Sequence, residues 1–367
     1  MSMKPRVIMA GGGTGGHIFP AIAIANAIKK LNPEAEILFI GAKGKMEMEK
    51  VPQAGYRIEG LDIAGFNRSS LIKNLGLPFK LIRSFFQVRS IFSSFQPTAV
   101  VGVGGYSSFP VLRFAQSKGI PTFIHEANSF AGKSNMLLGK KASLVFTGTD
   151  GMEKFFPAEK IRVTGNPVRA NLLHTAMDRA TAVRHFGLDP AFATVLVTGG
   201  SLGARGINEA IANNLDQLIG KDAQLIWQTG KPFLNQAKEA AKGMSRIWVN
   251  DFITEMDIAY AAADIVVSRA GAMALAELAV VKKPAVLVPY PLAAEDHQTV
   301  NAKRLVDKQA AIMVADADAK EKLVLQIRKL VDDTALRSFY RTHIAKLAIT
   351  DADTVVAKAI LEKSTGE

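Results

Sequence analysis

The first ordered pattern in the chain is Val7-Ile8-Met9-Ala10-Gly11-Gly12-Gly13-Thr14-Gly15-Gly16-His17-Ile18-Phe19-Pro20-Ala21, an apolar run that stops in glycines. Apolar residues at helical spacing follow it, and this order predicts a strand, a tight turn and a helix. Glycines without Cβ let backbone N–H groups approach a ligand, and the helix N-terminus adds partial positive charge. We therefore expect an anion or another closely held ligand at this turn; a turn without a ligand is the alternative.

The same glycines match the dinucleotide-binding pattern Gly11-x-Gly13-x-x-Gly16. That pattern also requires an acidic residue at the end of the next strand, where it binds a ribose. The next predicted strand is 37–40, which is followed by Gly41-Ala42-Lys43, and the acidic residues Glu34 and Glu36 precede it. The sequence therefore argues against NAD and for a phosphate or a closely held ligand.

Composition narrows the class of protein. A chain of 367 residues with 48% hydrophobic residues predicts two domains with full cores. It has no cysteine, which excludes disulfides and thiolate metal sites. We expect no secretory signal and no membrane span, because no apolar stretch approaches about 20 residues. The net charge of +12 and the mean hydropathy of +0.14 favour an anionic partner: nucleic acid, a phosphorylated substrate or a membrane surface.

Short apolar runs alternate with helical patterns in the first half, which is typical of a parallel doubly wound sheet. The predicted strands are 7–10, 37–40, 56–59, 99–103, 122–125, 144–147 and 162–164. The turn formers Gly165-Asn166-Pro167 then predict a domain boundary.

The second half repeats this plan. A strand at 194–198 enters Gly199-Gly200-Ser201-Leu202-Gly203, which echoes Gly12-Gly13-Thr14 and Gly16. Further strands are predicted at 224–227, 247–249, 265–268, 284–288 and 311–314. We predict an α/β protein of two Rossmann-like doubly wound parallel-sheet domains facing a cleft, with ligands at the carboxyl ends of the strands. The domains are expected at 1–165 and 166–344, with a C-terminal helix at about 345–367 that packs back on the first.

A third glycine turn, Gly104-Gly105-Tyr106, again follows a buried-looking strand. It has two interpretations of equal weight: contact with a ligand, or close packing of a helix on a strand.

Six motifs occur in order along the chain. They are Gly12-Gly13-Thr14-Gly15-Gly16-His17-x-x-Pro20-Ala21, Gly102-x-Gly104-Gly105-Tyr106-x-x-x-Pro110, His125-Glu126-x-Asn128, Gly165-Asn166-Pro167-Val168-Arg169, Gly199-Gly200-Ser201-x-Gly203-Ala204 and Ser268-Arg269-x-Gly271-Ala272-x-x-x-x-Glu277. Together they resemble the MurG family of bacterial cell-wall glycosyltransferases, over nearly the whole chain. The resemblance implies a GT-B fold and an inverting transfer of GlcNAc from UDP-GlcNAc to undecaprenyl-diphospho-MurNAc-pentapeptide (lipid I), which gives lipid II for peptidoglycan synthesis. It implies no metal and no cofactor.

The resemblance also implies roles for single residues. Thr14, Gly15 and Gly16 would lie on the sugar and acceptor side, with Gly104, Gly105 and Tyr106. Asn128 and Gln298 would contact the sugar, and Arg169 and Ser201 would face the diphosphate. Ile253 would offer its backbone to uracil, Ala272, Met273, Ala274, Leu275 and Ala276 would lie along the diphosphate and ribose, and Glu277 would bind the ribose hydroxyls. The chain departs from the family at Ala127, where glutamine is common.

The residue chemistry agrees with two of these roles. Glu277 is the only charge in Ala-Met-Ala-Leu-Ala-Glu-Leu-Ala, and a carboxylate accepts well from a diol, whereas most helical glutamates are simply solvated. The guanidinium of Arg169 suits a diphosphate, with a surface charge as the alternative.

Transfer of a sugar to a hydroxyl needs a general base. His17 follows the first glycine turn and is our candidate for the catalytic base, although it could instead orient the acceptor. His125 ends a strand and is a second histidine at that edge. Asp316-Ala-Asp318 has the spacing of a metal-binding Asp-x-Asp, but its place before a helix favours a helix cap.

Residues 68–92 contain five basic residues and no acid among many apolar ones. After Pro78 we predict a helix with apolar residues on more than one side, which indicates either a buried core helix or a surface that docks on anionic inner-leaflet lipids. The proposed membrane patch is Leu75, Phe79, Lys80, Ile82, Arg83 and Phe86. The expected location is peripheral, on the cytoplasmic face of the bacterial inner membrane.

Three alternatives stay open on the sequence alone. One is a transferase of the same fold for another lipid acceptor, and another is a UDP-GlcNAc epimerase. The third is a non-catalytic nucleotide-binding or nucleic-acid-binding protein, which we disfavour because aromatic and basic residues interleave only near Arg83 and Arg89.

Overall fold

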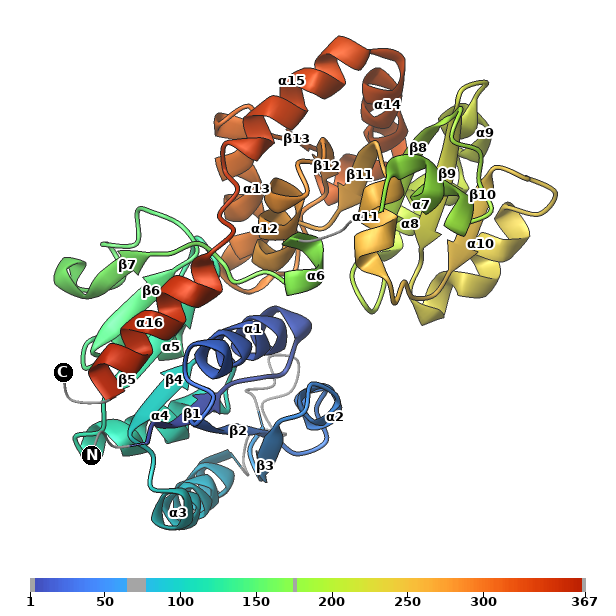
Figure 1. Cartoon of the computed structure of the whole chain (residues 1–367). Coiled ribbons are helices and arrows are strands. Elements are labelled where there is room, and N and C mark those ends of the chain that lie inside the picture. The colour runs from blue at the N-terminus through green and yellow to red at the C-terminus, as the bar shows by residue number, and fades with distance from the viewer. Residues whose placement is uncertain (1–3, 65–76, 174–176, 365–367) are drawn as a thin grey trace. The chain divides into compact units, whose positions relative to one another are not determined.

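Two parallel sheets organise the chain in this computed structural model, which describes residues 4–64, 77–173 and 177–364. Contacts divide the chain into unit 1, Met1–Arg169 with Thr350–Glu367, and unit 2, Ala170–Ile349. Every strand predicted from the sequence is present, with its ends within two residues of the predicted ones. Figure 1 labels the helices and strands of both units.

Unit 1 contains a seven-stranded sheet in the order β3-β2-β1-β4-β5-β6-β7, and its pairings are parallel. The strands are β1 (Arg6–Ala10), β2 (Glu36–Ala42), β3 (Arg57–Leu61), β4 (Ala99–Gly102), β5 (Thr122–Glu126), β6 (Leu144–Thr147) and β7 (Ile161–Val163). Because helices cover both faces, the central strands are apolar on both sides, as β1 shows from Val7 to Ala10.

Helices cover this sheet on both faces. Val7 and Met9 of β1 share a core with α1 (Gly15–Leu31) and α16 (Ala352–Ser364), which pack on each other. Ile8 and Ala10 share a second core with α3 (Leu77–Phe95), α4 (Ser108–Ser117) and α5 (Lys133–Gly139). The short helix α2 (Glu47–Gln53) packs on β2 and β3.

Unit 2 contains a six-stranded parallel sheet in the order β10-β9-β8-β11-β12-β13. The strands are β8 (Ala193–Thr198), β9 (Ala223–Gln228), β10 (Ile247–Asn250), β11 (Ile265–Ser268), β12 (Ala285–Leu287) and β13 (Ile312–Met313). The helices are α6 (Ala170–Leu173), α7 (Arg179–His185), α8 (Arg205–Ala212), α9 (Leu215–Ile219), α10 (Leu234–Ala240), α11 (Met256–Ala262), α12 (Ala272–Val280), α13 (His297–Asp307), α14 (Ala319–Asp332) and α15 (Thr334–Ala345). One core gathers α7, α11, α12 and α13, and the other α8, α9, α10 and α14.

The strand orders locate the place where each sheet can bind a ligand. In unit 1 the order reverses between β1 and β4, and in unit 2 between β8 and β11. At such a switch point the two following loops diverge to opposite faces and leave a crevice at the carboxyl ends of the strands. All three glycine turns noted in the sequence follow one of these strands.

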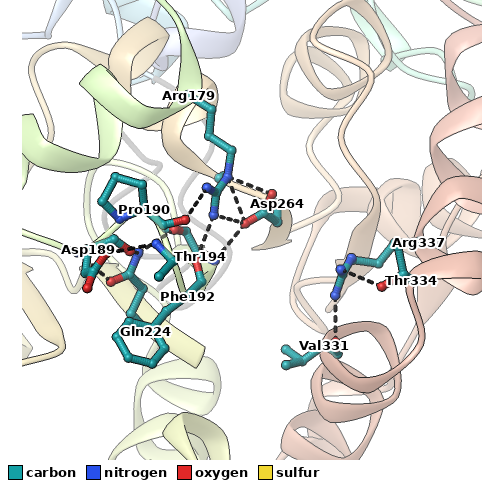
Figure 2. Close-up of polar contacts among 12 residues, drawn as sticks. Arg179, Asp189, Pro190, Phe192, Thr194, Gln224, Asp264, Val331, Thr334 and Arg337 are labelled. Carbon is teal, nitrogen blue, oxygen red and sulfur yellow. Dashed lines mark hydrogen bonds and ion pairs between the residues drawn. The ribbon is translucent and has the colours of Figure 1, made fainter. Parts of the chain in front are cut away.

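At the opposite edge of the unit 2 sheet, where the strands begin, Arg179 forms a network of hydrogen bonds (Figure 2). Its Nη2 lies 2.6 Å from Oδ2 of Asp264, just before β11, and also donates to the carbonyl of Phe192. Its Nη1 donates to the carbonyl of Pro190, and the same Asp264 carboxylate accepts from the backbone N–H of Thr194 in β8. This network joins the starts of β8 and β11 and therefore has a structural role.

We predict that Arg179→Met lowers the free energy of unfolding of unit 2 by about 1.5–3 kcal/mol, because Asp264 loses a charged partner. The chain has 2 tryptophans, and both Trp227 and Trp248 lie in unit 2, so their fluorescence in a urea titration reports this unit. The control is Arg205→Met, which breaks an exposed i,i+4 pair with Glu209 and should leave the urea midpoint nearly unchanged. Equal midpoints for both variants would contradict the structural role.

Candidate functional site

Two glycine turns meet at the switch point of unit 1. The N–H of Gly12, after β1, lies 3.4 Å from the carbonyl oxygen of Gly104, after β4. A Cβ on Gly105 would be 2.5 Å from the carbonyl oxygen of Gly12, and one on Gly104 would be 2.8 Å from the His17 ring. Glycine is therefore required at 104 and 105 by the packing of one turn on the other, which supports the packing interpretation of this turn. Tyr106 extends from it, half-buried, 3.8 Å from the position that a Cβ on Gly13 would take.

A buried carboxylate that the sequence analysis did not identify fills the first turn. Glu47, at the start of α2, is 1% exposed, and its Oε2 accepts from the N–H of Gly13 at 2.9 Å. Its Oε1 accepts from the N–H of Ala42 at 3.0 Å, at the end of β2. A Cβ on Gly12 would lie 2.2 Å from this carboxylate. The N–H of Gly13 thus bonds to a carboxylate of the protein itself, and a bound ligand at this turn stays a prediction.

Glu47 lies five residues past Ala42, the last residue of β2, and its carboxylate is directed into the turn. Its place in Lys45-Met46-Glu47-Met48-Glu49 gives no sign of burial, because charged residues flank it and Glu49 is exposed. No local sequence signal could have identified it.

His17 lies on the first turn of α1, and it is half-buried. Its Nδ1 lies 3.1 Å from the carbonyl oxygen of Gly12 and 3.4 Å from the hydroxyl of Thr14. Since a carbonyl oxygen only accepts, we assign the proton to Nδ1, and this leaves Nε2 as the nitrogen that can take up a proton.

The other histidine at this edge is not available for chemistry. His125 is 1% exposed in β5, and burial lowers its pKa to about 4, so the ring is neutral near pH 7. Its Nε2 lies 3.5 Å from the carbonyl oxygen of Gly165. His125 therefore lies near the end of its strand, as the sequence predicts, but it is buried there, because the loop after β7 covers it.

Glu126 shapes the loop after β5. It is 4% exposed, and its two oxygens accept from the backbone and side-chain amides of Asn128, from the N–H of Gly132 and from Nδ2 of Asn135. Asn128 is half-buried beside it. Ala127 is 6% exposed, and its carbonyl accepts from Nδ2 of Asn166, so the position where the family commonly has glutamine is buried here.

Arg169 ends unit 1. Its guanidinium carbon lies 5.6 Å from the centre of the Phe19 ring, on the first turns of α1. The cation is thus held beside the helix that carries His17, as a cation–π contact would hold it.

In unit 2 the glycine turn after β8 is open. Ser201 is exposed, and a Cβ on Gly200 would meet no atom within 4 Å. Gln228, which ends β9 and is 3% exposed, donates from Nε2 to the carbonyl of Gly200 at 2.9 Å and accepts from the N–H of Ile253 at 3.2 Å. Gln228 therefore joins the Ser201 turn to the Ile253 loop, a link that the sequence analysis missed.

On the other side of the switch point, α12 starts at Ala272 after the cap residue Gly271. Residues Ala272–Ala274 are half-buried, and Glu277 is 8% exposed one turn further along. The hydroxyl of Tyr260, on α11, donates to Oε2 of Glu277 at 3.2 Å and fixes the direction of the carboxylate. The helix terminus and the carboxylate thus lie at one edge of the sheet with Ser201.

Arg269, the basic residue of the sixth motif, orders the loop after β12. Its Nη1 donates to the carbonyls of Val288 and Pro289 and to Oδ1 of Asp316. The amide N–H of Tyr290, in the same loop, donates to Oε1 of Gln298 at 2.9 Å.

The expectation that Asp316 and Asp318 are helix caps is corrected in part. Asp318 stands at the cap position of α14, but its side chain makes no capping bond and pairs with Lys322, and Asp316 pairs with Arg269. The ion pairs replace capping because two cations lie within reach of the carboxylates. Among the residues that the structure describes, no group of acidic or histidine side chains could hold a metal ion.

The predicted membrane patch lies on α3 within the described residues, except Leu75. Val88 and Phe92 are buried on one face, whereas Phe79, Ile82 and Phe86 are 77%, 56% and 67% exposed. Lys80 and Arg83 are exposed beside them, and Arg83 lies 3.3 Å from Asp62. The helix therefore carries apolar residues on two sides, as predicted. None of the helices in the described ranges has the length and apolarity that crossing a bilayer requires.

Residues 7–147 match the glycosyltransferase family 28 N-terminal domain, and residues 194–353 match its C-terminal domain. The chain is 50% identical, over 365 residues, to a protein of Phocaeicola vulgatus named UDP-N-acetylglucosamine–N-acetylmuramyl-(pentapeptide) pyrophosphoryl-undecaprenol N-acetylglucosamine transferase; the match covers 99% of this chain and 97% of that protein.

Among solved structures, Acinetobacter baumannii MurG superposes with a TM-score of 0.77 and 28% identity, covering 98% of this chain and 99% of that one. A putative UDP-N-acetylglucosamine 2-epimerase from Listeria monocytogenes superposes with a TM-score of 0.69 but 16% identity, covering 98% and 96%, which shows a shared fold alone.

Proposed function

The chain belongs to glycosyltransferase family 28 and is an N-acetylglucosaminyltransferase that uses UDP-GlcNAc to convert lipid I into lipid II, and we propose how its residues divide this work. The activity is supported chiefly by one observation: about half of the residues of this chain are identical to those of such a transferase over nearly the full length of both. The fold agrees with it, since the chain has the GT-B fold of MurG.

Unit 2 binds UDP-GlcNAc in this proposal. The open turn at Gly200 and Ser201 and the N-terminus of α12 flank the β8/β11 switch point, and helix N-terminal N–H groups favour a diphosphate. The carboxylate of Glu277, oriented by Tyr260, accepts from the ribose hydroxyls. Ile253 presents its carbonyl to the uracil, because its N–H already donates to Gln228. Gln298 contacts the sugar.

Unit 1 binds the acceptor. Thr14, Gly15, Gly16 and Tyr106 lie around His17 on the acceptor side. Asn128, for the transferred sugar, and Arg169, for the diphosphate, come from loops at the same sheet edge. The acceptor hydroxyl attacks the anomeric carbon of GlcNAc while the bond from that carbon to UDP breaks. Nε2 of His17 takes the hydroxyl proton, and UDP leaves with the bonding electrons, where Arg169 and Ser201 stabilise its charge.

The activity is tested by UDP release from UDP-GlcNAc with and without a lipid I analogue. We expect release to require the acceptor and the disaccharide-linked product to appear with it in equal amount. An epimerase would consume UDP-GlcNAc without acceptor and give an epimeric sugar, and a transferase for another lipid would ignore lipid I. Either result would overturn the assignment.

We predict that Glu277→Ala raises the KM for UDP-GlcNAc by about 10- to 150-fold, because a charged acceptor of hydrogen bonds is worth about 1.5–3 kcal/mol. The matched control is Glu239→Gln, an exposed glutamate of α10 in the same unit, whose KM should be unchanged. Tryptophan fluorescence checks that unit 2 stays folded. An unchanged KM in a folded Glu277→Ala variant would remove Glu277 from the ribose site.

We predict that His17→Ala lowers kcat by about 10²–10⁴-fold, the usual worth of a general base, with little change in the KM for UDP-GlcNAc. His343→Ala, on the outer helix α15, is the control and should keep normal kcat. A near-normal kcat for His17→Ala would rule out the base role.

The acceptor is lipid-linked, and α3 supplies a surface that fits a membrane. From Ile63 to Thr149 the sequence has ten basic residues and one acidic residue, Glu126, which is buried. The exposed side chains of Phe79, Ile82 and Phe86 stand among Lys80 and Arg83. Apolar side chains enter the headgroup layer, and each basic neighbour adds about 1 kcal/mol at an anionic surface. We infer peripheral docking on the inner leaflet.

We predict that the protein binds vesicles containing anionic lipid and that binding weakens as salt rises. Lys80→Glu with Arg83→Glu should reduce vesicle binding and turnover of membrane-embedded acceptor, while a short-chain soluble acceptor is still used. Asp62→Asn breaks the pair with Arg83 but keeps the Arg83 charge, so it separates the loss of that pair from the loss of membrane charge. Equal binding to neutral and anionic vesicles, or equal loss with both acceptors, would reject the docking surface.

A further inference from the structure

We propose that Glu47 is a positioning residue for His17, and that it acts through the peptide unit between Gly12 and Gly13. This inference rests on the proposed role of His17 as the base. It concerns how the protein sets the tautomer of that base, and it uses only contacts within unit 1.

Glu47 and His17 contact opposite sides of the same peptide unit. The N–H of Gly13 donates to Oε2 of Glu47 at 2.9 Å, and the carbonyl of the preceding Gly12 lies 3.1 Å from Nδ1 of His17. This N–H and this carbonyl belong to one planar peptide group. The carboxylate therefore fixes the plane that presents the carbonyl to the imidazole.

The Glu47 carboxylate also acts electrostatically on this peptide unit. A hydrogen bond from the N–H to a carboxylate polarises the peptide and makes its carbonyl a stronger acceptor, most of all where water is excluded. Glu47 is 1% exposed and anchored by a second bond from the N–H of Ala42. Burial, together with this nearby carboxylate, raises the pKa of Tyr106, so the charge is felt across the turn. The stronger carbonyl favours a proton on Nδ1 and leaves Nε2 to accept the proton of the acceptor.

Gly12 and Gly41 leave the space that the Glu47 side chain occupies. A Cβ on Gly12 would lie 2.2 Å from a carboxylate oxygen of Glu47, and a Cβ on Gly41 would lie 2.4 Å from its side chain. Two glycines on different elements thus open the position that Glu47 occupies. In the matching turn of unit 2, the N–H of Gly200 bonds to Thr198, and a Cβ on Gly200 would meet nothing within 4 Å. The arrangement is specific to the turn that carries His17.

A catalytic base is commonly oriented by a third group, usually a carboxylate in direct contact with the imidazole. Here the described contacts insert one peptide unit between the carboxylate and the imidazole. Glu47→Gln keeps the shape of the side chain but replaces one accepting oxygen with a donating amide, which cannot accept from both N–H groups.

The test compares Glu47→Gln with Glu49→Gln, an exposed glutamate two residues further along α2 that pairs with Lys50. We expect Glu47→Gln to lower kcat at least tenfold and to leave the KM for UDP-GlcNAc within twofold, while Glu49→Gln changes neither. Nitrogen-15 NMR of labelled histidine, with the His17 signal identified by its loss in His17→Ala, should show the Nδ1-protonated tautomer in the wild type and a shift away from it in Glu47→Gln.

A wild-type His17 protonated on Nε2 would overturn the proposal without any variant, and so would a kcat for Glu47→Gln equal to that for Glu49→Gln. If Glu47→Gln does not fold, Glu47→Asp takes its place, and the wild-type tautomer still decides. A normal kcat for His17→Ala would refute the base role alone, because the tautomer and its response to Glu47 are measured independently of turnover.

Discussion

The contact between the turns after β1 and β4 constrains everything else in unit 1. With the missing Cβ of Gly105 only 2.5 Å from the Gly12 carbonyl oxygen, neither backbone can move without moving the other. That contact sits at the switch point of the sheet, where loops normally diverge and leave a crevice. Unit 1 has instead closed part of the crevice with its own backbone and one buried carboxylate. What remains at that edge is the helix terminus with Thr14 and Gly16, which are exposed, and His17, which is half-buried.

The two units share a plan and differ in how they use it. Both place a glycine turn and a helix N-terminus at the reversal of a parallel sheet. In unit 1 the protein supplies the anion, Glu47, whereas the unit 2 turn stays open at Gly200. A diphosphate is therefore favoured in unit 2, where no internal carboxylate bonds to the Gly200 N–H, which Thr198 takes. In the proposed division of work, the open turn of unit 2 receives the nucleotide, and the filled turn of unit 1 does not compete for its diphosphate.

The sequence predicted the sheets well because buried parallel strands read as continuous apolar runs, as 7–10 and 265–268 do. It selected His17 and Glu277 as candidates because glycine turns and an isolated charge on an apolar helix are local signals; their roles stay predictions. It missed Glu47, Gln228 and Tyr260, since each acts through a partner more than ten residues away in sequence and looks like an ordinary residue where it stands. The same limit explains Asp316, whose local context indicates a cap while Arg269, 47 residues earlier, takes it as a partner.

The positive charge of the chain is concentrated in one segment, and its surroundings indicate which kind of anionic partner it suits. The segment 63–149 carries a net charge of +9 out of +12 for the chain, with ten basic residues against Glu126. Single-stranded nucleic acid is bound in grooves where bases stack on recessed aromatic rings. Phe79 and Phe86 instead project from one helix at 77% and 67% exposure, and the aromatic rings packed under α3 and α4, Phe92 and Phe114, face the core. Projecting rings with a basic surround suit a surface into which side chains can sink, and a bilayer with anionic headgroups is such a surface.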